Sequence, residues 1–341
     1  MNRKKTICNI IFLIAIFTFT FYSLLKDQDL KELIALTETV NIKYILLSFI
    51  FVLLFICSES VIIYYMMWIL KYKVPIFSCI KYSFIGFFFS CITPSASGGQ
   101  PAQMYYMNKD NVNIATSSLV LLIVTIAYKF VLVFIGVLLI IFQYSFMINH
   151  IGRACIFLYL GLLLNIICVI AMLVFVFSST FANKIMCGGL RFLEKIKILK
   201  YKRQRHERLN HALEQYHKAA NVFKNHKMVM FNVFLITLFQ RCSLFFITYL
   251  VYYGFGFREY NIWQIVTLQA VIAISVDMLP LPGGMGASEN LFIQIFKPIF
   301  GSTVMSGMLL SRGINYYAVL IISAIVTVYA HLTLGKKQKK Y

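Results

Sequence analysis

The sequence alternates between long apolar runs and short polar stretches. A helix needs roughly 20 apolar residues to cross the hydrocarbon core of a bilayer. Runs that approach or exceed this length predict transmembrane helices at 7–25, 43–70, 114–142, 153–180, 228–253 and 313–334. We therefore expect an all-α polytopic membrane protein with about six transmembrane helices, folded as a single domain over residues 1–341.

Three shorter apolar runs, at 80–93, 262–279 and 286–300, adjoin segments that cannot continue a helix. The first is followed by Pro- and Gly-rich residues 94–101, and the other two flank a similar string at 279–286. This pattern predicts two re-entrant hairpins of half-helices, one in each half of the chain. Two alternatives remain open. Both strings could be loops between ordinary spans, or the second hairpin could cross fully, with residues 303–311 adding a further pass.

Composition supports a membrane protein and excludes a soluble fold of this size. Hydrophobic residues make up 60% of the chain and charged residues 13%, whereas soluble domains are nearer half apolar and a quarter charged. The net charge is +20, from 32 Lys and Arg against 12 Asp and Glu. Because these basic residues lie between apolar runs, membrane topology and anionic lipid explain them better than nucleic acid, which we do not expect as a partner.

The positions of the basic clusters predict the orientation. Lys and Arg prefer the cytoplasmic side, and the clusters at 3–5, 181–227 and 336–340 fall on one side when both hairpins are re-entrant. We expect a multi-pass cell-membrane protein with both termini in the cytoplasm and 7–25 retained as the first span. The basic 181–227 segment is expected to be a cytoplasmic loop that lies on the inner leaflet or in water.

The two interrupted segments are the candidate binding site. Irregular backbone within a bilayer is tolerated where protein or a water-filled cavity covers it, and paired breaks are typical of transporters. The breaks have opposite predicted entry sides, as an inverted repeat would give. Free N–H groups at a half-helix N-terminus attract anions, which favours a phospholipid head group. Pro101 suits the first position of one helix, and either Ser288 or the Gly-Met-Gly backbone would cap the other.

Ionisable residues inside apolar runs are expensive and usually face a partner or a cavity. The pairs that we predict are Glu59 with Lys129, and Asp277 or Glu289 with Arg312. Arg241 and Arg312 are interpreted as lying near span ends, where snorkelling to the interface is the alternative. The eight cysteines lack metal-binding spacing and no Walker motif is present, so we expect no metal or cofactor.

The break residues resemble a known family. Thr93-Pro94 with Gly98-Gly99-Gln100-Pro101, and Pro280-Leu281-Pro282-Gly283-Gly284-Met285-Gly286, are similar to the paired signatures of the lysylphosphatidylglycerol synthase transmembrane region, the flippase-like domain of the multiple peptide resistance factor. The resemblance covers nearly the whole chain and also includes Lys129, Glu289 and Arg312. It implies head-group contact at Thr93, Pro94, Gly98, Gly99, Gln100, Pro101, Pro282, Gly283, Gly284, Gly286 and Glu289. The family often has Glu at position 100, a basic residue at 103 and Arg at 288, where this chain has Gln, Gln and Ser.

The resemblance implies a bacterial protein that translocates or binds an anionic or aminoacylated phospholipid such as lysylphosphatidylglycerol. In two-domain members, a soluble domain transfers lysine from lysyl-tRNA to the lipid. We expect no such domain after the last span, which disfavours the alternative of a phosphatidylglycerol lysyltransferase. A lipid-binding scaffold without transport is the other alternative. A separate lipid-modifying enzyme and a second copy of the chain remain open as partners.

Overall fold

The computed structural model describes residues 40–196 and 203–337, which are helical and contain no strand. Within these ranges, five segments are long and apolar enough to cross a membrane. They are α3 (Ile42–Ile69), α6 (Ile114–Phe142), α8 (Cys155–Phe177), α11 (Lys227–Gly254) and the helical stretch Pro282–Leu332. The predicted span at 7–25 lies outside the described residues. The helices confirm a multi-pass membrane protein.

The long helices are apolar on both their inner and their outer sides. In α3, Val52 and Ile56 are buried in the protein, while Leu46 and Ile50 remain more than half exposed. Such an outward apolar face suits lipid rather than water. The helix begins where the Asn41 side chain accepts a hydrogen bond from the Lys43 amide, as an N-cap residue does.

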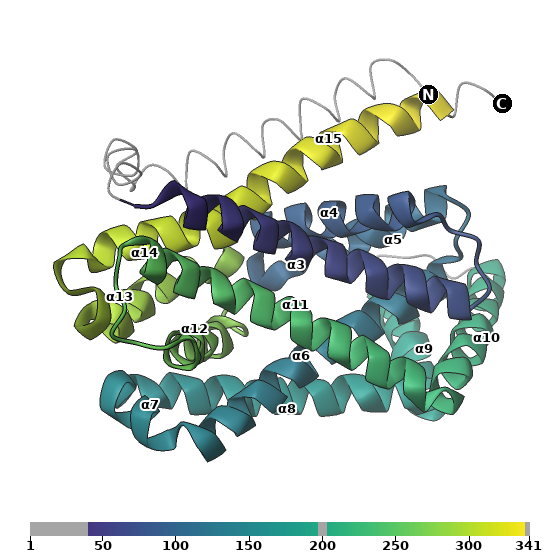
Figure 1. The fold of residues 1–341 in the computed structure, drawn as a ribbon. Helices are drawn as coiled ribbons and strands as arrows, with labels where there is room; N and C mark the ends of the chain where they lie inside the picture. Colours follow the sequence, from purple (N-terminus) through teal and green to yellow (C-terminus); the bar gives the residue numbers. More distant parts are fainter. Residues whose placement is uncertain (1–39, 197–202, 338–341) are drawn as a thin grey trace.

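The first half of the described chain builds one helical hairpin between two long helices. Helix α4 (Ile76–Ile92) packs against α3 and against α5 (Gly99–Lys109), and α6 follows. A short helix that we did not predict, α7 (Tyr144–Ile151), then leads to α8, which packs on α6. The purple α3 and the green α11 run side by side through the molecule (Figure 1).

The second half has the same succession of long, short, short and long helices. Helix α12 (Ile262–Val276) packs against α11 and against α13 (Ala287–Phe300). Helix α14 (Val304–Arg312) packs against α13 and continues through the π-helix Gly313–Ala318 into α15 (Val319–Lys337). The prediction that the last helix begins at 313 was wrong, because Arg312 has internal partners and does not end the helix. Residues 304–337 therefore form one continuous helical stretch.

The basic segment at 181–227 is mainly two helices, α9 (Ser179–Lys195) and α10 (Arg203–Asn225). Leu213, Tyr216 and Ala220 are buried on one face of α10, and α10 packs on α6 and α8. The segment is therefore helical rather than an open loop, because the apolar side chains of α10 pack on other helices; its position in water or on a leaflet stays a prediction. Burial raises the pKa of the Tyr216 phenol to about 12.

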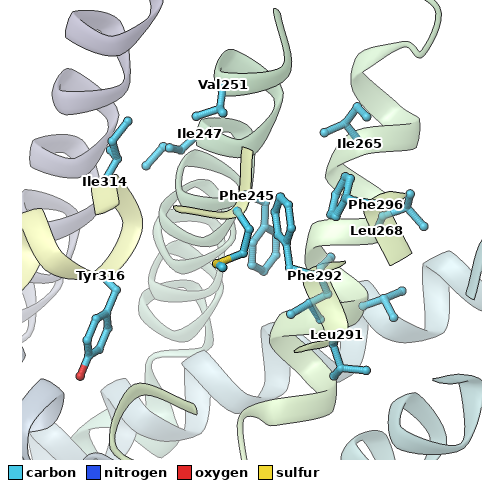
Figure 2. Packing of buried hydrophobic residues seen from close by; sticks show 14 of the residues in the cluster. Phe245, Ile247, Val251, Ile265, Leu268, Leu291, Phe292, Phe296, Ile314 and Tyr316 are labelled. Atoms are coloured by element: carbon cyan, nitrogen blue, oxygen red, sulfur yellow. The ribbon is translucent and has the colours of Figure 1, made fainter. Parts of the chain in front are cut away.

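The core around the second hairpin is rich in aromatic residues. Figure 2 shows Phe292 and Phe296 of α13 beside Phe245 of α11, and the rings of Phe292 and Phe296 stack with centroids 4.4 Å apart. Helix α8 approaches α12 so closely at Gly161 that an added Cβ would overlap the Ile274 carbonyl oxygen. This packing holds the end of α12, and with it the second break, in place.

Candidate functional site

The first break is a 3-10 turn at Pro94–Ala96 between α4 and α5. The Thr93 hydroxyl donates to the Phe89 carbonyl at 2.6 Å and accepts from the Gly98 amide at 2.8 Å, which closes the loop. Gly99 sits against α4, where a Cβ would lie 2.8 Å from the Gly86 carbonyl oxygen. These residues fold the hairpin and set the distance between its two helices.

The second break is a 3-10 turn at Pro282–Gly284 between α12 and α13. Gly283 has a φ of 56°, and the Tyr316 ring occupies the space that a Cβ at Gly283 would need. Arg312 donates from Nη2 to the Gly283 carbonyl at 3.0 Å. Both a left-handed backbone and close packing therefore require glycine at this position.

The two breaks contact each other. The Ser95 hydroxyl of the first donates to the carbonyl of Leu279, just before the second, at 3.4 Å. The Tyr316 hydroxyl donates to the Cys91 carbonyl at the end of α4 at 2.8 Å. The chain thus brings together two strings whose contacting residues, Ser95 and Leu279, are 184 positions apart in the sequence.

One helix start differs from its prediction and the other agrees with one of its two alternatives. Helix α5 begins at Gly99, so Pro101 is its third residue rather than its first. The N-cap of α13 is Gly286, in the predicted Gly-Met-Gly string, and the Ser288 hydroxyl instead donates to the Glu289 carboxylate at 3.0 Å. Because Glu289 lies in the first turn of α13, this helix end already has a negative charge of its own.

Two ion pairs join the helices around the breaks. Arg312 Nε lies 2.8 Å from Glu289 Oε1, one of the two pairings that we predicted for Arg312. Lys129 Nζ lies 2.8 Å from Asp277 Oδ2, and Tyr128 donates to the other oxygen of Asp277. The predicted pairing of Glu59 with Lys129 was wrong, because Lys129 is held by Asp277.

Glu59 instead accepts a hydrogen bond from the Gln103 side-chain amide at 2.7 Å. Arg241 lies in the middle of α11, so its predicted place near a span end was wrong. Its guanidinium carbon lies 3.9 Å from the Tyr128 ring centroid and 4.9 Å from that of Phe55. Aromatic faces attract cations, and they hold this side chain inside the protein where snorkelling would carry it out.

Two cavities lie beside the breaks. The first-break cavity has a volume of about 380 Å³ and is lined by Glu59, Gln100, Gln103 and Lys129 among others. The second-break cavity, of about 270 Å³, is lined by Gly283, Gly284, Ser288, Arg312 and Tyr316 among others. Ser90, Ser95, Ala96, Tyr128, Arg241 and Asp277 line both. Volumes of this order suit a polar head group more than a whole lipid.

The predicted site residues have two different positions. Eight of them line one or both cavities: Gln100, Gly283, Gly284, Glu59, Lys129, Arg241, Asp277 and Arg312. A second set shapes the breaks or the helix starts without lining either cavity: Thr93, Pro94, Gly98, Gly99, Pro101, Pro282, Gly286 and Glu289. Sequence reasoning missed Tyr128 and Gln103 as lining residues, although Tyr128 precedes a mid-span lysine and is a natural partner for a neighbouring carboxylate.

Comparison with known proteins identifies the family of the chain. A family model described as the lysylphosphatidylglycerol synthase TM region matches residues 10–323, which include both breaks and all the cavity charges. The comparison with curated proteins finds no match. The chain therefore belongs to the family of the lysylphosphatidylglycerol synthase TM region.

Proposed function

We propose that this protein translocates an anionic or aminoacylated phospholipid, and that the head group passes through the two cavities at the breaks. The observation that carries the proposal is the meeting of the two breaks at two cavities that share the charged residues Arg241 and Asp277. A charged residue inside a membrane protein is costly unless it serves a partner or a pathway. A phosphodiester is the anion that a bilayer supplies in quantity.

The short helices support a re-entrant arrangement. Helices α4, α5, α12 and α13 have 17, 11, 15 and 14 residues. At 1.5 Å per residue, even α4 reaches only about 25 Å, less than the roughly 30 Å of a hydrocarbon core. Each hairpin would therefore enter the bilayer and return on the same side. Its turn would lie at a depth where a head group needs polar contacts.

The two breaks share a backbone path, which supports an internal repeat. Thr93 and Leu281 have φ values of −115° and −117°, and the prolines follow them. Ser95 and Gly283 then have φ values of 50° and 56°, and Ala96 and Gly284 have 54° and 66°. Non-glycine residues rarely adopt this left-handed region. Two consecutive occurrences in each break favour a common origin over chance.

Helix contacts agree with a two-fold relation between the halves. Helix α3 packs on α4 as α11 packs on α12, and α4 packs on α15 as α12 packs on α6. Helix α3 contacts its counterpart α11, and the first break contacts the second. Inverted repeats of this kind place a site where it can face either leaflet in turn. Both termini then lie in the cytoplasm by the charge distribution of the loops.

Movement of labelled lipid tests the proposal. Purified protein is reconstituted with acyl-labelled fluorescent phosphatidylglycerol, and a membrane-impermeant quencher reports how fast the label exchanges between leaflets. We expect faster exchange than in empty vesicles. We also expect a loss of exchange in Gly283→Ala, where the added Cβ overlaps Tyr316, and no loss in Gly188→Ala, where a Cβ has open space.

The same preparation separates the alternative functions. Binding of phosphatidylglycerol without exchange would favour a scaffold. Formation of lysylphosphatidylglycerol from lysyl-tRNA would favour the synthase activity in the family's name. We propose the lipid-moving role because the matched family region is the TM region and the cavities have head-group dimensions.

A further inference from the structure

The acidic residues that line the two cavities have different partners. Asp277 is bonded to the Lys129 ammonium and to the Tyr128 hydroxyl. Glu59 is bonded to the Gln103 amide at 2.7 Å. An ammonium group at contact distance balances the negative charge of a carboxylate. An amide has both a donor and an acceptor, so it can bond either the charged or the protonated carboxyl group.

Arg241 is a cationic residue that lines the same cavity as Glu59. Its guanidinium lies over the ring of Phe55, one helical turn before Glu59 on α3, and both side chains line the first-break cavity. No salt bridge of Arg241 occurs among the described residues, and its Nε has no hydrogen-bond partner there. The guanidinium is thus held by aromatic rings, with hydrogen-bonding capacity to spare.

We propose that Arg241 is the anchor for the lipid phosphodiester and that Glu59 takes up a proton when this anion binds. The inference rests on the proposed function and adds that a proton accompanies the lipid. The ionisable groups that line the same cavity are Arg241, Lys129, Tyr128 and Asp277. Lys129 is neutralised by Asp277, so the arriving phosphate and the Glu59 carboxylate share Arg241 as their unpaired counter-charge.

Two anions cannot both be well stabilised by one cation in a poorly hydrated cavity. When the phosphodiester contacts Arg241, Glu59 is stabilised as the neutral acid, and the proton comes from the aqueous side through the cavity. The Gln103 side chain reorients to accept from the new hydroxyl. One lipid anion and one proton then pass together without net charge, so a proton gradient can drive the lipid.

Reciprocal linkage gives the expected measurement. Each unit fall in pH should tighten phosphatidylglycerol binding to the full-length protein by up to about tenfold, over the range where one proton is taken up per lipid bound. Glu59→Gln should bind at all pH values as the wild type does at low pH. Glu59→Asp should retain the pH dependence. Glu207→Gln, which removes an exposed carboxylate on α10, should behave as the wild type.

Vesicles that contain a pH-sensitive dye test the coupling during transport. Wild-type protein should acidify the lumen as phosphatidylglycerol moves inward, and Glu59→Gln should move lipid without acidification. Lipid exchange with a flat pH profile in the wild type, or an unchanged pH dependence of binding in Glu59→Gln, would overturn the inference while leaving lipid translocation intact. Absence of any lipid exchange would instead refute the proposed function, and pH-linked binding would still support proton uptake by Glu59.

Discussion

Lys129 Nζ lies 2.8 Å from Asp277 Oδ2 and ties the middle of α6 to the residue that ends α12, directly before the second break. The two side chains are 13% and 7% exposed. A pair this buried pays a large desolvation cost, so its partners depend strongly on each other. The position of the second break is therefore coupled to α6.

A double-mutant cycle measures this dependence. We expect Lys129→Met or Asp277→Asn alone to lower the free energy of unfolding by about 3 to 5 kcal/mol, because each leaves a buried charge without its partner. The double variant should be less destabilised than the sum of the two. Thermal unfolding in detergent provides the measurement.

The exposed pair Arg203 and Glu207 is the control for that cycle. Its side chains are 87% and 63% exposed, and they are one helical turn apart. Removing either should change stability by no more than about 0.5 kcal/mol. Additive effects at Lys129 and Asp277 would mean that the ion pair contributes nothing beyond its separate members.

Gly283 combines a φ of 56° with a ψ of 17°, which is the left-handed helical region. Alanine in this backbone conformation alone should cost about 1 to 2 kcal/mol. Gly283→Ala should cost more than that, because its Cβ overlaps the Tyr316 ring. Chemical denaturation measures the loss, with Gly188→Ala, whose Cβ has open space, as the control that should lose no stability. A loss at Gly283 no larger than the backbone cost would contradict the close packing of Tyr316 on Gly283.

At Ala96, a substitution should change the stability in the opposite direction. Its φ of 54° is unfavourable for a residue with a Cβ, so Ala96→Gly should leave stability unchanged or raise it by about 1 kcal/mol. The same substitution at Ala102, inside α5, should lower stability by about 1 kcal/mol through lost helix propensity. Melting temperatures that move in the same direction would argue against the left-handed turn.

Tyr216 gives a pH-dependent prediction outside the membrane-spanning helices. Its buried hydroxyl has no hydrogen-bond partner among the described residues, so Tyr216→Phe should stabilise the protein by about 1 kcal/mol. Burial raises the pKa of Tyr216 to about 12. The unfolded chain therefore loses this proton first, so this group leaves the free energy of unfolding of the wild type unchanged below about pH 10 and lowers it as the pH rises further.

The gain from Tyr216→Phe should accordingly be larger at pH 11 than at pH 8. Unfolding by denaturant at the two values checks this, with wild type and variant measured together so that other groups cancel. A gain independent of pH would indicate that the phenol has reached solvent or a partner.

Apolar run length was enough to predict the spans at α3, α6, α8 and α11 within a few residues of their observed bounds, because membrane thickness fixes that length. Helix α14 was missed as part of the last span because Arg312 interrupts the apolar run. Its internal partners, Glu289 and the Gly283 carbonyl, explain why a charged residue is accommodated there. The pairing of Lys129 with Asp277 rather than Glu59 depends on how α6 meets α12. Sequence spacing along single helices has no information on that contact.

For a related reason, the left-handed conformation of Ser95 and Ala96 could not be predicted from the sequence. Glycine marks this conformation at Gly283 and Gly284, but the first break adopts it with residues that have a side chain. Conversely, the glycines at 98 and 99 serve close packing against α4. Composition locates such a break, whereas the assignment of each residue within it requires the fold.

Because Ser95 bonds to Leu279 and Tyr316 bonds to Cys91, neither hairpin tip can withdraw without breaking a bond to the opposite half. In the proposed translocation, a shift of one hairpin would therefore be transmitted to the other half of the protein. These two bonds would keep both ends of the proposed path from opening together, so ions would not leak through while a lipid changes sides.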